Sequence, residues 1–122
     1  DQVKRIRELI CHIINVHHLW ISRILGEEPE NEDWDDLPFH AWSQLNKENY
    51  QQSLLSLKQL DLHQNIKYTT SDGLIMEKTL VQLLSHIIHH GTYHRGQINT
   101  LLTQNGLIPI ACNRIEFNEV SY

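Results

Sequence analysis

Two long segments of the sequence place apolar residues at the three- and four-residue spacing of an amphipathic α-helix, and this pattern most constrains the fold. They cover residues 2–25 and 79–104, and each stops at or just before a glycine, a residue that often ends helices. Residues 47–62 repeat the pattern over a shorter stretch. The apolar side of that segment comprises Leu54, Leu55, Leu57 and Leu60. Because such faces must pack together, the sequence predicts a helical bundle in a single domain, residues 1–122.

A β-hairpin is predicted between the second and third helical segments. In residues 65–78 the side chains alternate on both sides of Asp72-Gly73, a pair that favours tight turns. A single two-stranded hairpin is only marginally stable by itself, so we expect it to pack against the helices as a small addition to the fold. Residues 39–46 are ambiguous and suit one or two helical turns.

The acidic residues are concentrated in one loop. Residues 27–36 read EEPENEDWDD and contain seven of the fifteen Asp and Glu residues of the chain. Because this stretch contains Pro29 and follows Gly26, it predicts a solvated connection. Trp34 and Trp42 flank its acidic end, where they either hold the loop down or line the entrance of a site.

Composition excludes several classes of protein. The net charge of −5 and the absence of a basic stripe argue against a nucleic-acid-binding protein. No apolar run approaches the roughly 20 residues that a membrane-spanning helix needs. Cys11 and Cys112 cannot form a disulfide framework and are expected to be buried free thiols. With no signal peptide, the expected location is the cytoplasm.

The number of predicted helices is low for a bundle. Three helices, one of them short, leave apolar faces uncovered, and the chain opens directly in an amphipathic segment at Asp1. We therefore expect that an N-terminal helix is absent from this sequence or that a partner chain supplies the fourth helix. Uncovered faces in such bundles also favour a homodimer.

Four of the nine histidines lie within nine residues, at positions 86, 89, 90 and 94. With His86 set at 0° on a helical wheel, His90 lies near about 40° and His94 near about 80°, inside the apolar stripe. His89 points toward the edge of that stripe. Two histidines separated by four residues on one helix face can bind one metal ion, as in zinc proteases. Gly91 occupies the place of the protease glutamate, which excludes a metalloprotease.

Gly91 and Gly96 in the interior of this helix suggest close approach of another helix, or space beside a site. A third ligand would come from the first helix, which carries His12, His17 and His18. His17 falls inside the apolar stripe of that helix, His12 lies at its edge and His18 points away. The spacing slightly favours His17 and does not decide between His17 and His12.

The string HHGTYHRGQINTLLTQNG, at positions 89–106, resembles the DinB family of metal-dependent bacterial proteins. Members of that family carry a pattern like NHxxHHRGQ on one helix, and an earlier helix carries a His followed by a Trp and an Arg, here His12, Trp20 and Arg23. The hairpin and the segment after position 106 also look like family features. The chain departs from the pattern at His89, where the family usually has Asn, and at Tyr93, where it usually has His.

The resemblance implies an all-α four-helix bundle of the up-down type with a long crossover, in which the family's first helix precedes Asp1. It implies one divalent metal ion, nickel or zinc, bound by His12, His90 and His94. Further residues expected around the site, as support for the ligands or as pocket wall, are His86, His89, Tyr93, Gln97 and His17.

The function that follows from the resemblance is that of a metal-dependent enzyme, a thiol S-transferase or a hydrolase, with a low-molecular-weight thiol as the partner molecule. Tyr93 or Gln97 would orient the substrate, and Arg23 or Arg95 would pair with its carboxylate. The alternative is a non-catalytic metal-binding or stress-response module.

Overall fold

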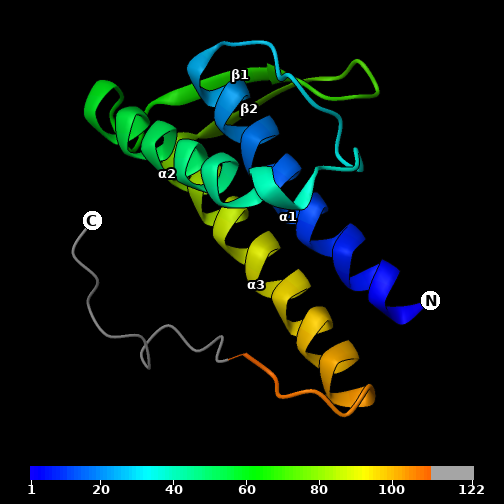
Figure 1. Cartoon of the computed structure of the whole chain (residues 1–122). Helices are drawn as coiled ribbons and strands as arrows, with labels where there is room; N and C mark the ends of the chain where they lie inside the picture. The colour runs from blue at the N-terminus through cyan, green and yellow to red at the C-terminus, as the bar shows by residue number, and fades with distance from the viewer. Residues whose placement is uncertain (111–122) are drawn as a thin grey trace.

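The computed structural model describes residues 1–110, which form three α-helices and a two-stranded sheet (Figure 1). In chain order the elements are α1 (Gln2–Leu25), the 3-10 helix η1 (Phe39–Ala41), α2 (Trp42–Gln59), β1 (Asn65–Thr69), β2 (Ile75–Thr79) and α3 (Leu80–Gln104). The helical class and the hairpin are therefore confirmed. Since residues 1–110 contain three helices, the four-helix bundle remains a prediction. Most of the predicted irregular tail, with Cys112, lies outside the described residues.

The ends of the two long helices are fixed by local capping. At the start of α1, the Asp1 carboxylate accepts a hydrogen bond from the Val3 amide, and at its end Gly26 takes a left-handed conformation with φ of 73°. α3 begins with a capping box, in which the Thr79 hydroxyl accepts from the Gln82 amide and the Gln82 side chain accepts from the Thr79 amide. These local signals explain why both helices were predictable from the sequence.

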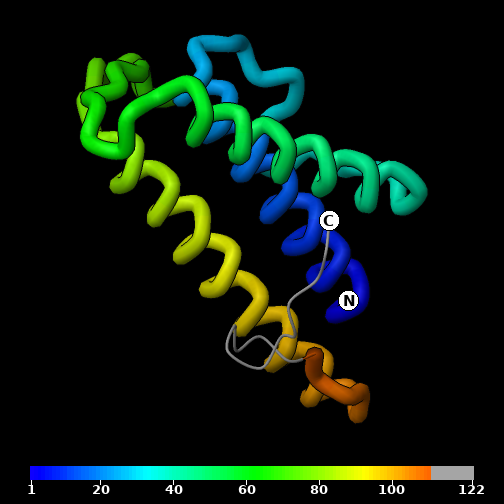
Figure 2. Tube along the Cα trace, turned by 90° about the vertical axis from the view of Figure 1, so that its left-hand side faces the viewer, coloured from blue at the N-terminus to red at the C-terminus, as the bar shows by residue number. Residues whose placement is uncertain are grey.

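α1 is the centre of the fold because it packs against both α2 and α3 (Figure 2). α1 and α3 run antiparallel, so the start of α1 and the end of α3 lie at the same end of the molecule. The hairpin pairs Asn65 with Thr79 and Thr69 with Ile75, and it lies where the end of α1 meets the start of α3. Among residues 1–110, no helix is long and apolar enough to cross a membrane.

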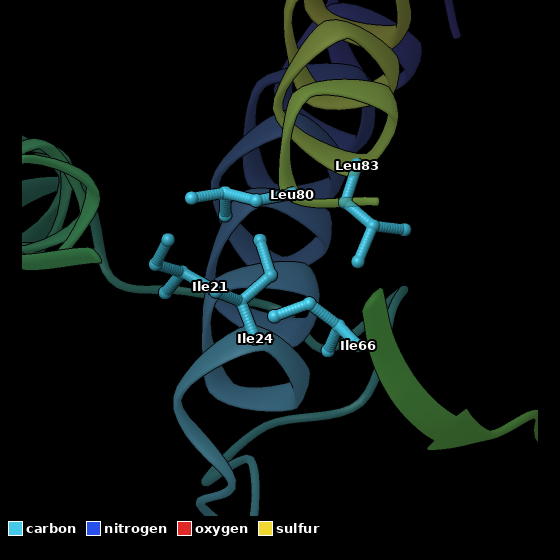
Figure 3. Packing of buried hydrophobic residues seen from close by; sticks show 5 residues of the cluster. All are labelled: Ile21, Ile24, Ile66, Leu80 and Leu83. Atoms are coloured by element: carbon cyan, nitrogen blue, oxygen red, sulfur yellow. The ribbon is translucent and has the colours of Figure 1, made fainter. Parts of the chain in front are cut away.

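The main hydrophobic core joins α1, β1 and α3 (Figure 3). Its five buried members are Ile21, Ile24, Ile66, Leu80 and Leu83. Trp20, Leu60 and Tyr68 pack against this cluster from its edge. The hairpin therefore contributes Ile66 to the core, as a marginal hairpin must to persist in water.

α2 differs from its prediction in its bounds and in its buried side. The helix begins at Trp42, directly after η1, and ends at Gln59 rather than running over residues 47–62. Leu54 and Leu57, predicted on its apolar side, are 41% and 48% exposed. The buried side instead carries Asn49, whose side-chain amide donates to the carbonyl of Ile14 on α1 at 3.0 Å. Hydrogen bonds to α1 thus decide which face of α2 is buried.

Of the two reasons predicted for the interior glycines of α3, the close approach of another helix is contradicted, while open space is found at Gly96. A Cβ atom added at Gly91 would meet the Arg95 side chain of the same helix, at 2.9 Å from Nη1. A Cβ atom added at Gly96 would meet nothing within 4 Å among the described residues. Neither glycine marks the close approach of another helix in this part of the chain.

Candidate metal centre

Three histidines from two antiparallel helices meet at one point. α1 contributes His12, and α3 contributes His90 and His94, which lie one turn apart. Nε2 of His90 lies 3.2 Å from Nε2 of His12 and 3.1 Å from Nε2 of His94. One nitrogen from each ring lies within 4.8 Å of the others. The structure therefore brings together the three residues that the family resemblance implied, although the ligand role itself stays a prediction.

The far nitrogen of two of these rings is held by an oxygen acceptor. Nδ1 of His12 donates to the carbonyl of Asp33 at 2.9 Å, and Nδ1 of His94 donates to the side-chain oxygen of Gln97 at 2.6 Å. A neutral imidazole carries one proton, so His12 and His94 both present an unprotonated Nε2 to the centre. Hydrogen bonds of this kind orient the ligands of known metal sites.

The donor set fits a divalent metal ion. Zn–N bonds of 2.0–2.1 Å in a tetrahedral site place two ligand nitrogens about 3.3 Å apart, close to the two Nε2–Nε2 distances observed. A proton on Nε2 of His90 can form a hydrogen bond to only one of the two neighbouring nitrogens, Nε2 of His12 or Nε2 of His94. A cation at the centre would satisfy the lone pairs of all three rings, as nickel or zinc does with imidazole ligands.

Burial favours the neutral, metal-binding form of these rings. Desolvation, followed by the neighbouring His94, His12 and His86, lowers the pKa of His90 to about 4. The pKa of His12 is also lowered, mainly by desolvation, although the hydrogen bond that the ring donates to the Asp33 carbonyl acts in the opposite direction and raises it. Both imidazoles are therefore uncharged near neutral pH.

The acidic loop is a largely exposed connection, as predicted, and its Trp34 in addition covers His12. Trp34 stacks on the His12 ring, with centroids 3.6 Å apart and an interplanar angle of 8°. Three side chains of α1 hold the loop: Arg7 pairs with Asp36 at 3.0 Å, Asn15 donates to the Asp35 carbonyl at 2.9 Å, and His18 accepts from the Glu30 amide at 2.9 Å. The sequence placed Trp34 at the loop but not against a histidine ring.

His86 and Tyr93 also lie beside the histidine trio. The His86 ring centroid is 6.1 Å from that of His90, and the Tyr93 ring packs against His94 at 5.0 Å. Tyr93 is 64% exposed, and its hydroxyl accepts a long 3.5 Å hydrogen bond from Gln97. Of the three, His86 lines the smaller cavity described below and Gln97 contacts His94, while the roles expected for them and for Tyr93 stay predictions.

His89 and His17 lie elsewhere. His89 is exposed and lines a shallow depression with Val81, Gln82, Ser85 and His86. His17 faces α2, where its Nε2 lies 2.8 Å from the Ser53 hydroxyl. The structure therefore does not bring His17 to the centre, although helical spacing slightly favoured it over His12.

Two adjoining cavities lead to the trio. The smaller, of about 370 Å³, is lined by His12 and His90 together with residues of α1, the acidic loop and the hairpin. The larger, of about 970 Å³, lies between that loop and the hairpin. Both are lined by Leu19, Arg23, Asp33, Tyr68, Thr70 and Ser71. A small molecule can therefore reach the side of the trio that faces the cavity.

Comparison with known proteins identifies one family. The model of the DinB family matches residues 1–121. A segment of 32 residues is 53% identical to the protein named Protein DinB from Bacillus subtilis (strain 168), and it covers 26% of this chain. The same segment spans 19% of the length of that relative. No solved structure matches the chain.

Proposed function

The chain belongs to the DinB family, and we propose that it binds one divalent metal ion, nickel or zinc, through His12, His90 and His94. The observation that carries the proposal is the convergence of three Nε2 atoms. His12 is buried, His90 and His94 are half-buried, and acceptors at Nδ1 orient the rings of His12 and His94. Three imidazoles leave coordination positions open, and the smaller cavity lies beside two of the rings.

We propose that the metal site is catalytic, of the thiol S-transferase or hydrolase type. When bound, the metal would stabilise a thiolate or lower the pKa of a water molecule. The residues of the chain contribute the rest: Asp33 and Gln97 fix two of the rings, and the cavity admits a ligand from the hairpin side. We assign Tyr93, which packs beside His94 and is largely exposed, a part in orienting the ligand.

A second candidate function, a non-catalytic metal-binding module, is favoured by one observation. The trio connects α1 to α3, and the His12 ring also holds the acidic loop through Asp33 and Trp34. A metal at this point would therefore tie three separate parts of the chain together and stabilise the fold.

Metal content tests the site. We expect one metal ion per chain in the parent protein by elemental analysis, and less than a tenth of that in His90→Ala and His94→Ala. His89→Ala serves as the matched control, since this exposed histidine lies on the same helix outside the trio. Stoichiometric metal that persists in both ligand variants would refute the assignment.

Metal removal separates the two functions. For an enzyme, the protein stays folded after chelation, and an added thiol shifts the absorption spectrum of the cobalt-substituted protein. For a module, chelation melts the fold, and no thiol and electrophile pair turns over. Circular dichroism with and without chelator, and the cobalt spectrum with and without 2-mercaptoethanol, distinguish these outcomes.

A further inference from the structure

Arg23, in the last turn of α1, is a half-buried cation that has no anionic partner among residues 1–110. Its Cζ atom lies 4.7 Å from the ring centroid of Trp20 and 5.6 Å from that of Tyr68. Among residues 1–110 its guanidinium takes part in no ion pair and no side-chain hydrogen bond. The two rings therefore hold the side chain in place while its N–H donors stay available.

The position of Arg23 connects it to the candidate metal centre. Arg23 lines the larger cavity and also the smaller one, whose wall includes His12 and His90. A ligand in these cavities can therefore contact the guanidinium at one end and the histidine trio at the other.

The charges along the larger cavity restrict where an anion can bind. Its loop side carries five carboxylates, which repel an anion: Glu27, Glu28, Glu32, Asp33 and Asp35. The opposite side carries Arg23, Lys67 and the hydroxyl groups of Thr69, Thr70 and Ser71 from the hairpin. An anionic group is therefore accommodated on the hairpin side, at Arg23.

We propose that Arg23 binds the carboxylate of a small organic ligand whose other end reaches the metal centre. A planar guanidinium binds a carboxylate through two parallel hydrogen bonds, and one already held by aromatic rings loses little freedom on binding. The inference rests on the proposed function, because it takes the trio as the site at which the ligand reacts. It makes Arg23 the residue that selects carboxylate-bearing ligands over neutral ones.

Arg95, the other arginine expected to face a substrate, provides a matched control. Its Nη2 atom donates to the Thr92 hydroxyl at 3.3 Å, and the side chain lines a separate apolar cavity with Ile10, Ile13 and Trp42. Replacement of Arg95 by Gln removes the same charge as Arg23→Gln but leaves both cavities beside the trio intact.

The test compares two thiols that differ by a carboxylate. Isothermal titration of zinc-loaded protein gives the affinity for 3-mercaptopropionate relative to 2-mercaptoethanol, and elemental analysis gives the zinc content of every sample. We expect the parent and Arg95→Gln to prefer 3-mercaptopropionate, and Arg23→Gln to lose about 10- to 100-fold of that preference while keeping its zinc. Arg23→Lys keeps the charge without the planar group and should fall in between.

Each outcome decides the matter. An unchanged preference in zinc-loaded Arg23→Gln, or no preference in the parent, overturns the role of Arg23 and leaves the metal site standing. A parent protein that binds no zinc or nickel overturns both proposals. If Arg23→Gln does not fold, as circular dichroism would show, the parent preference and its reduction in Arg23→Lys remain the deciding measurements.

Discussion

His17 should make the stability of this protein depend on pH. The Ser53 hydroxyl donates to the carbonyl of Asn49 at 2.8 Å, so its oxygen is left to accept from Nε2 of His17 at 2.8 Å. The hydrogen bond places a proton on Nε2 of His17, at the interface between α1 and α2. Burial, followed by the neighbouring His18, lowers the pKa of His17 to about 4, against the ordinary value of 6.5.

The sign and size of the effect follow from proton linkage. A histidine whose pKa is lower in the folded protein binds protons more readily when unfolded, so its contribution to stability is lost as the pH falls. The loss begins near pH 6.5 and is complete near pH 4. At pH 5 it amounts to about 2 kcal/mol, and below pH 4 it approaches about 3 kcal/mol.

Urea denaturation between pH 8 and pH 5 measures the pH-dependent contribution of His17 to the free energy of unfolding, when the parent is compared with His17→Gln. A chelator keeps both proteins free of metal, so that the trio contributes equally to each. We expect the parent to lose about 2 kcal/mol more than His17→Gln over this range, while the exposed control His63→Gln follows the parent. Parallel stability curves for the parent and His17→Gln would refute the assignment of a half-buried, neutral His17.

Three further predictions concern the centre and the core. Gln97→Leu removes the acceptor that orients His94 and should weaken metal binding by about 10- to 100-fold in competition with a chromophoric chelator; an unchanged affinity would exclude that role. Trp34→Ala removes the ring stacked on His12, which is worth about 0.5–1.5 kcal/mol, and should weaken metal binding up to about tenfold in the same assay; a larger loss would point to collapse of the loop. Leu80→Ala, at a fully buried position, should lower the free energy of unfolding by about 2–5 kcal/mol, whereas the exposed neighbour in Val81→Ala should cost far less; equal losses would contradict the observed core.

The parts of the fold that could be predicted are those determined by neighbours along the chain. α1 covers Gln2–Leu25 as its apolar spacing and Gly26 indicate, and α3 follows from Thr79, its spacing and its end at Gln104. α2 was less predictable because its buried side is chosen by partners on α1. Asn49 is buried since it donates to the Ile14 carbonyl, whereas Leu54 and Leu57 of the predicted apolar side remain exposed.

The candidate site was likewise predictable in one part and not in another. The four-residue spacing of His90 and His94 predicts two rings on one face, and the structure has them there. Spacing could not choose between His12 and His17 because α1 is buried on two sides. His12 faces α3 and His17 faces α2, so both look like core positions on a helical wheel, and only the family resemblance named His12.

The contribution of the acidic loop to the centre could not be predicted from the sequence. The loop is attached to α1 largely through its backbone: the Asp33 and Asp35 carbonyls accept and the Glu30 amide donates. Nearly every residue type carries these groups, so they leave no mark in the sequence. Most of its carboxylates therefore remain exposed beside the larger cavity. Their field attracts cations and repels anions. A divalent metal is thus favoured on approach, while an anionic ligand needs the compensating charge of Arg23 on the opposite wall. The loop that orients His12 would therefore oppose the binding of anionic ligands, so the preference for a carboxylate would depend on the guanidinium of Arg23.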